Sequence, residues 1–139
     1  MAKRWEHFRH EADIGVRGYG PTLAEAFEQV ALAMTAVITE PASVGRRERV
    51  EIVCENNDPE FLLIDWLNSI IFEMATRHLL FGDFKVSIAD GQLSAVALGE
   101  GVDVARHKPA VEVKGATLTE LRVAREASGE WLTQCVVDV

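Results

Sequence analysis

Cysteine is scarce in this sequence, and its two cysteines do not form a metal-binding motif. Cys54 and Cys135 lie far apart, each within an apolar stretch typical of a strand, and no Cys-x-x-Cys pair occurs. This spacing argues against a zinc knuckle. We expect two buried thiols in a reducing compartment.

Basic residues are also few relative to acidic ones. The chain has 14 Lys and Arg against 22 Asp and Glu, which gives a formal net charge of -8. Proteins that bind nucleic acid without regard to its sequence use Lys and Arg to replace the counterions of the phosphates. The charge therefore argues against direct RNA binding, although an acidic protein can act on RNA through a protein partner that holds it.

Long uninterrupted apolar runs are missing. The most apolar run, residues 61–74, contains Asp65 and Asn68 and is shorter than a helix that spans a bilayer. The first residues, Met1 to His7, lack the apolar core of a secretory signal. We therefore expect a cytoplasmic protein that does not enter a membrane.

The sequence does have the composition of a globular domain. Of its 139 residues, 48% are hydrophobic and 26% are charged, which is ordinary for a folded protein. This length corresponds to one domain, residues 1–139, with enough chain to bury a core.

Periodicity predicts two helices among several strands. Thr22 and Glu25 form a capping box before an apolar stripe at helical spacing. Asp58 and Pro59 begin a second, strongly apolar helix that runs to about His78. Alternating or β-branched segments predict strands at residues 5–10, 50–54, 84–88, 93–98, 111–114, 121–126 and 131–137, with a polar loop or irregular connection at 99–107. This order favours an α+β domain of two layers, in which two helices pack on one face of a mainly antiparallel or mixed sheet.

Two carboxylates stand at the ends of the outermost predicted strands. Asp13 begins an extended, glycine-punctuated segment, and Asp138 follows the last strand beside the terminal carboxylate of Val139. If the two strand ends meet, three oxygen donors would make a site for a hard cation such as calcium or magnesium. Two plainer interpretations stay open, namely a turn aspartate that bonds to local backbone and a solvated chain end.

No enzyme motif accompanies these acids, so no catalytic residue is predicted. The glycine-punctuated segment lacks the Gly-Lys-Ser/Thr of a phosphate loop. His7 and His10 alternate onto opposite faces of a strand and would share a face only across a bulge. Lys114 is typical of a surface lysine in a strand, and the pair Arg106 and His107 could bind an anion or nothing.

Several short motifs occur in a fixed order along almost the whole chain. They are His10-Glu11-Ala12-Asp13-Ile14-Gly15-Val16, Gly20-x-Thr22-Leu23-x-Glu25-Ala26-Phe27, Leu63-Ile64-Asp65-Trp66-Leu67-Asn68, Leu80-Phe81-x-x-Phe84, Gly99-Glu100, Arg106-His107, Val113-Lys114 and Val136-Val137-Asp138-Val139. Together they resemble the archease family, and the combination is far more specific than any one of them.

The resemblance implies a protein that assists an RtcB-type RNA ligase, which joins RNA ends through a histidine that is guanylylated from GTP. The chain would be an activator and not an enzyme. It would promote the guanylylation step and multiple turnover in tRNA splicing and RNA repair. Its partner would be the ligase, and it would meet RNA and GTP only through that ligase.

The resemblance also implies which residues take part. The divalent metal of the family, typically calcium, would fall on Asp13, Asp138 and the terminal Val139, although oxygen ligands suit magnesium and manganese as well. The functional lysine of the family falls on Lys114. Asp13, Lys114 and Asp138 would therefore act together on the ligase.

Three further polar residues of the matching stretches, His10, Arg106 and His107, are candidates for accessory roles. The sequence departs from many relatives after Lys114, where Leu118-Thr119 replaces an aromatic-histidine pair. A task performed by that histidine would be absent or moved in this chain.

Two other interpretations stay open on the sequence. A generic chaperone-like or protein-binding module would need no carboxylates at a chain end. A small metallohydrolase would need a general base and a water-bearing metal in a pocket, and no motif with that spacing occurs.

Overall fold

The computed structural model describes residues 2–139, and its elements follow the predicted order closely. In chain order they are β1 (Arg4–His10), β2 (Asp13–Gly20), α1 (Leu23–Ile38), a 3₁₀ turn (Pro41–Ser43), β3 (Glu48–Glu55), α2 (Pro59–Arg77), β4 (Leu79–Ala89), β5 (Gln92–Gly101), α3 (Val104–His107), β6 (Gly115–Ala116), β7 (Arg122–Arg125) and β8 (Trp131–Asp138). Both predicted helices and most of the predicted strands are confirmed.

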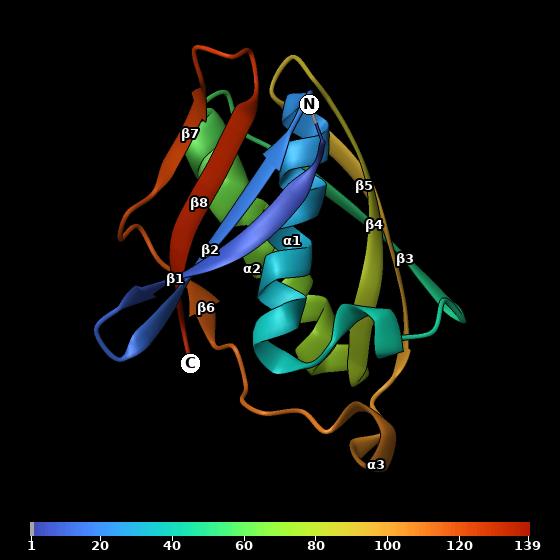
Figure 1. Ribbon diagram of the computed structural model, residues 1–139. Helices are drawn as coiled ribbons and strands as arrows, with labels where there is room; N and C mark the ends of the chain where they lie inside the picture. Colours follow the sequence, from blue (N-terminus) through green and yellow to red (C-terminus); the bar gives the residue numbers. More distant parts are fainter. Residues whose placement is uncertain (1) are drawn as a thin grey trace.

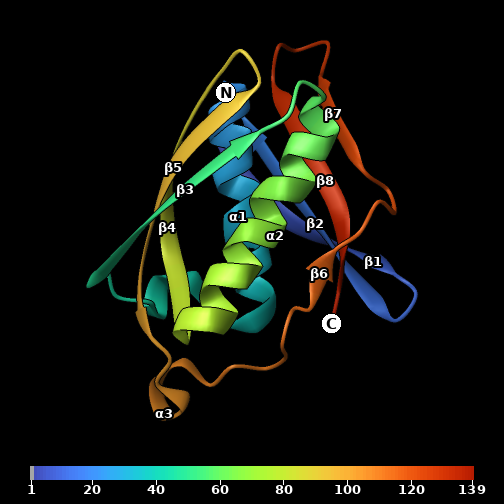
Figure 2. The ribbon, with the colours of Figure 1, turned by 180° about the vertical axis from the view of Figure 1, so that it is seen from behind.

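The strands form two antiparallel sheets, and the two long helices lie between them (Figure 1). One sheet has five strands, in the order β1-β2-β8-β6 with β7 also paired to β8, and the other has the order β3-β5-β4. Helix α1 packs against β1, β2 and β8 on one side and against β4 on the other, and α2 also contacts strands of both sheets. Figure 2 shows the same arrangement from behind. The α+β class is confirmed, with two sheets where the sequence suggested one.

The apolar character of the helices explains the second sheet. In α2 the neighbouring residues Leu62 and Leu63 are both buried, and so are Trp66 and Leu67, so that its apolar surface extends round much of the helix. A helix of this kind must be covered on more than one side. The two helices are also joined directly, because the indole N–H of Trp66 donates a hydrogen bond of 3.0 Å to the carbonyl oxygen of Phe27.

The helix ends carry the caps that the sequence predicts. The Thr22 hydroxyl accepts a hydrogen bond from the main-chain N–H of Glu25 and donates one to the carboxylate of the same residue. Asp58 caps α2, with Pro59 at its first position. His78 ends α2 in a left-handed conformation, with φ 56° and ψ 46°. Local sequence therefore sets both helix starts.

Two segments in the last third of the chain differ from the prediction. Residues 99–107 are not a loop throughout, because β5 continues to Gly101 and α3 follows. Residues 111–114 are not a strand, and only the two residues of β6 pair with β8. In this segment only Val113 is buried, and the main-chain N–H of Ala110 donates to Ile38 at 2.8 Å. Residues 111–114 are therefore held by a few contacts and do not show the alternating burial of a strand.

Both cysteines are buried and free, as predicted. Burial raises the pKa of the Cys135 thiol to about 12 and also raises the pKa of Cys54. Neither thiol is therefore activated as a nucleophile. Within residues 2–139, no helix combines the length and the apolar character that crossing a membrane requires.

Candidate functional site

A line of polar residues crosses one end of the five-stranded sheet. In the β1–β2 hairpin, His10 lies opposite Asp13. Between β2 and β8 the pairing runs as far as Ile14 opposite Val137, and the next step along both strands sets Asp13 opposite Asp138. We name His10, Asp13 and Asp138 the carboxylate row.

The carboxylate row faces away from the helices. Ile14 and Val137 pack against the hydrophobic core, and successive side chains of a strand point to opposite faces, so Asp13 and Asp138 point outward. Asp138 is exposed and Asp13 is half-buried. Residues opposite each other in antiparallel strands have Cα atoms about 4.5–5.5 Å apart, so two like charges share one face there. Within residues 2–139, neither carboxylate accepts a hydrogen bond or forms an ion pair.

The last strand is held in place at its end. Gly115 lies opposite Asp138, and the main-chain N–H of Lys114 donates a hydrogen bond of 2.7 Å to the main-chain oxygen of Asp138. Val139 packs partly against the core. Figure 1 shows the end of the chain beside β6 and near the β1–β2 hairpin. Asp138 is therefore positioned by the fold, which rules out the interpretation of a frayed chain end.

Lys114 lies between the carboxylate row and a neighbouring cleft. Its main-chain N–H is bonded to the main-chain oxygen of Asp138. The residue also lines a cleft of about 490 Å³, together with Met74, Ala75 and His78 at the end of α2. The structure thus brings Asp13 and Asp138 to one point and sets Lys114 at the border between that point and the cleft.

Asn68 is a residue of this site that the sequence did not reveal. Its side-chain oxygen accepts a hydrogen bond of 2.9 Å from the main-chain N–H of Ala116, which ties β6 to α2. In the sequence, Asn68 is one of two polar residues within the most apolar run, and nothing there indicates this contact. A partner 48 positions away in the chain leaves no local signal that sequence reasoning could have used.

Arg106 and His107 do not belong to the carboxylate row. Both bond to the carboxylate of Glu100, and His107 is buried with its Nε2 3.1 Å from that carboxylate. The main-chain N–H of Gly45 donates to the same group. Arg106, then Gly45, then His107 lower the pKa of Glu100 to about 2. The anion that Arg106 and His107 bind is therefore part of the protein itself, and their role is to join α3 and the 44–47 segment to β5.

The donor chemistry of the row suits a hard cation. Two unneutralised carboxylates on one face offer the oxygen ligands that calcium, magnesium and manganese prefer. Among residues 2–139, no group of three or more His, Cys, Asp or Glu side chains could hold a metal ion. A third protein donor would therefore come from the main-chain carboxylate of Val139.

Comparison with known proteins shows what this chain is similar to. Residues 5–139 match the Archease protein family. The chain is 41% identical to the protein archease of Pyrococcus furiosus over 141 residues, which cover 99% of each sequence. It is 37% identical to that of Sulfolobus acidocaldarius, over 98% of this chain and 99% of the relative.

Two solved structures have the same fold. A solution structure of a Methanobacterium thermoautotrophicum protein matches with a TM-score of 0.85 and 32% identity, over 97% of this chain and 98% of that one. A crystal structure from Thermotoga maritima, of an archease called a possible chaperone, matches with a TM-score of 0.58 and 19% identity, over 96% and 99% of the two chains. The second likeness shows the fold alone.

Proposed function

This chain belongs to the archease family, and from that premise we propose that it is a protein cofactor of an RtcB-type RNA ligase. It promotes GTP-dependent guanylylation of the ligase and multiple turnover in tRNA splicing and RNA repair. The ligase is its partner, and it meets RNA and GTP only through that ligase. We place it in the cytoplasm, where its two free thiols stay reduced.

The observation that carries this proposal is the carboxylate row. Two carboxylates on one outward face, without a hydrogen-bond or ion-pair partner among residues 2–139, are free to interact favourably with a cation. Asp13, Asp138 and the terminal carboxylate of Val139 hold the divalent ion, with calcium first and magnesium or manganese as alternatives. Such an ion would supply positive charge where a nucleotide is bound.

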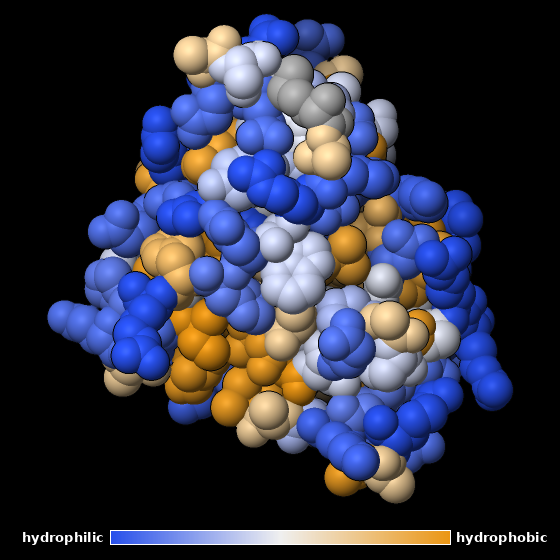
Figure 3. All heavy atoms as spheres, in the orientation of Figure 1, coloured by the Kyte–Doolittle hydropathy of each residue, from blue (hydrophilic) through white to orange (hydrophobic). Residues whose placement is uncertain are grey.

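Lys114 lies at the edge of the sheet beside the carboxylate row and takes part in the same function. Its ammonium is a compact charge on a long flexible stem and can meet a phosphate oxygen of the ligase's nucleotide. Figure 3 shows hydrophobic residues gathered near the end of β8 and β6, within a largely hydrophilic surface. Charged groups beside an exposed apolar patch are a common composition of a protein-binding surface.

A titration tests the metal part of this proposal. We predict that calcium binds the wild-type protein at one site and that Asp138→Asn weakens binding at least about tenfold, because one of three carboxylate ligands loses its charge. Isothermal titration calorimetry measures the dissociation constant. Glu126→Gln removes one charge at the other end of β7 and β8 and should leave it unchanged. Equal binding by wild type and Asp138→Asn would contradict the assignment.

A second candidate function is a chaperone-like binding module; the Thermotoga maritima protein of the same fold is called a possible chaperone. The observation that favours it is a set of exposed apolar side chains, among them Phe72 at 62% and Val53 at 75% exposure. Light scattering of an unrelated aggregating client separates the two functions. Suppression of aggregation that survives Asp138→Asn, without any effect on the ligase, would place the chaperone function first.

A further inference from the structure

Strand β3 forms an open edge of the three-stranded sheet. It pairs only with β5, because the order of that sheet is β3-β5-β4. The opposite edge strand, β4, lies against α1, and the carboxylate of Glu28 accepts a hydrogen bond from the main-chain N–H of Val86 there. A side chain therefore covers part of the main chain at the β4 edge of the sheet. Among residues 2–139, the β3 edge has no such cover.

The pairing shows which main-chain groups of β3 are free. Just beyond the strand, the N–H of Asn56 donates to the carbonyl oxygen of Gly91 at 2.9 Å. Because main-chain groups alternate in direction along a strand, Ile52 and Cys54 bond towards β5, whereas Glu51 and Val53 present their N–H and C=O groups to the open side. Within residues 2–139, no hydrogen bond outside the ladder uses these groups.

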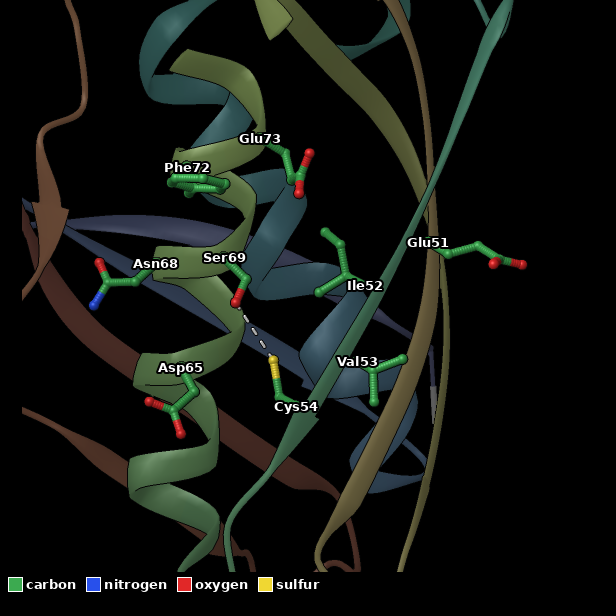
Figure 4. A pocket seen from close by; sticks show the side chains of 9 residues that line it. All are labelled: Glu51, Ile52, Val53, Cys54, Asp65, Asn68, Ser69, Phe72 and Glu73. Carbon is green, nitrogen blue, oxygen red and sulfur yellow. Dashed lines mark hydrogen bonds between the residues drawn. The ribbon is translucent and has the colours of Figure 1, made fainter. Parts of the chain in front are cut away.

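A groove runs along this open edge, between β3 and α2 (Figure 4). Its volume is about 500 Å³. The Cys54 thiol and the Ser69 hydroxyl, 3.5 Å apart, join its two walls, and Figure 4 shows these two side chains pointing at each other. An exposed strand edge facing a helix is the geometry in which an extended peptide can add as a further strand.

The charge of the groove is acidic. Glu51 lines it from β3, and Asp65 and Glu73 line it from α2. Glu73 is bonded to Arg77 and Glu51 lies 3.7 Å from Arg49, while Asp65 has no ion-pair partner within residues 2–139.

Apolar surface accompanies these charges. Phe72 on α2 lines the groove and is 62% exposed, and Val53 on β3 is 75% exposed. In a strand added to β3, alternate side chains would lie over Val53 on one face and against α2 on the other. An occupant that alternates β-branched and basic side chains would match both the apolar and the acidic groups.

We propose that the open edge of β3 binds an extended, basic segment of a partner protein by strand addition. The free groups of Glu51 and Val53 supply the main-chain hydrogen bonds, and Asp65 on α2 selects Lys or Arg side chains. A second copy of this chain is a poorer occupant, because each copy carries a net charge of -8 and would set one acidic groove against another. The inference stands apart from the carboxylate row and does not rest on the ligase.

The test uses a labelled peptide of seven residues that alternates lysine and valine, with its binding to the full chain followed by fluorescence anisotropy. Peptides N-methylated at alternate amides lose main-chain N–H donors but keep their lysine charges. They therefore distinguish binding by main-chain pairing from binding by charge. We predict that methylation of one alternate set weakens binding by about tenfold or more and that methylation of the other set has little effect, because only one set faces β3. Equal loss for both sets, or no binding of the parent peptide, would overturn the proposal.

Two protein variants complete the test. Val53→Pro removes an N–H at the open edge and keeps the hydrogen bonds with β5, since proline is tolerated on the free side of an edge strand. We expect this variant to bind the two sets of methylated peptides with equal affinity. Asp65→Asn should weaken binding several-fold and reduce its salt dependence, whereas Asp90→Asn, at the β4–β5 turn, should change neither. A protein that sediments as a dimer and that Val53→Pro makes monomeric would identify a second copy as the occupant and overturn the proposal.

Discussion

Glu100 is a buried carboxylate that the fold holds in its charged form. Its three bonding partners, Arg106, Gly45 and His107, lower its pKa to about 2 from the ordinary 4.5. A carboxylate whose pKa falls on folding stabilises the folded state fully above its unfolded pKa, and this contribution is lost as the pH drops towards the folded pKa. The relevant window therefore lies between the two values.

We predict that Glu100→Gln lowers the melting temperature near neutral pH and that the difference from wild type shrinks between about pH 5 and pH 2. Circular dichroism during heating at a series of pH values measures the difference. Glu126→Gln, which removes a half-buried acid whose ion-pair partner Arg122 lies 4.0 Å away, should stay close to wild type throughout. If the difference in melting temperature between Glu100→Gln and wild type did not change with pH, the charge of Glu100 would not be what stabilises the fold.

The sequence allowed some of these residues to be singled out and not others. Asp13 and Asp138 could be found because each borders a strand with a clear pattern, and the register of β1, β2 and β8 then aligns them. For Arg106 and His107 the sequence left open an anion or nothing, and their partner is Glu100, which looks like an ordinary surface acid in the sequence. Burial of a charged group depends on distant packing, which local pattern does not contain.

At the scale of elements, β6 is the shortest strand and depends on a side chain from α2. Asn68 accepts the hydrogen bond from Ala116 that joins them. We predict that Asn68→Ala lowers the free energy of unfolding by about 1 kcal/mol and speeds amide hydrogen exchange at residues 114–117. Hydrogen exchange with mass spectrometry measures the second effect.

Thr76→Ala is the matched control for Asn68→Ala, because the Thr76 hydroxyl bonds only to the main chain of α2 itself. It should leave exchange at residues 114–117 unchanged. Unaltered exchange in both variants would mean that β6 is held by its pairing with β8 alone.

Helix α1 can approach β2 because residue 18 has no side chain. A Cβ atom on Gly18 would lie 2.3 Å from the main-chain nitrogen of Val30 and 2.6 Å from the carbonyl oxygen of Ala26. We predict that Gly18→Ala lowers the free energy of unfolding by about 1–3 kcal/mol, since rigid backbone must move. Urea unfolding gives the value.

Gly101→Ala is the control for that substitution. A Cβ on Gly101 would have no neighbour within 4 Å among the described residues, so its effect should stay below about 1 kcal/mol. Equal losses from the two substitutions would show that backbone flexibility, and not close packing, decides the cost at residue 18.

At the scale of the whole molecule, the α+β class could be predicted from the sequence, but the division into two sheets could not. Strand patterns show where chain is extended and which face is apolar, whereas they do not show that β8 pairs with β2 across more than a hundred positions. The apolar circumference of α2 was the available signal, because such a helix needs cover on two sides. The two surfaces proposed above therefore lie on different elements: the carboxylate row is at the end of β8, and the groove runs along β3.

At the same scale, the strand order explains why the acids of β2 and β8 meet although they lie near opposite ends of the chain. Pairing of β2 with β8 brings residues near the two ends of the chain together at one rim of the sheet. Under the proposed function, this rim is the part of the molecule that acts on the ligase.

The most direct measurement of that assignment is the number of RNA joints made per ligase molecule. Limiting RtcB-type ligase is given excess broken RNA, GTP and divalent metal, with wild-type protein, Asp13→Asn, Asp138→Asn or Glu126→Gln. We predict many turnovers with wild type and Glu126→Gln. With Asp13→Asn or Asp138→Asn we predict about one turnover, although all four proteins are folded. Full turnover with Asp13→Asn and Asp138→Asn, or no stimulation by wild type, would contradict it.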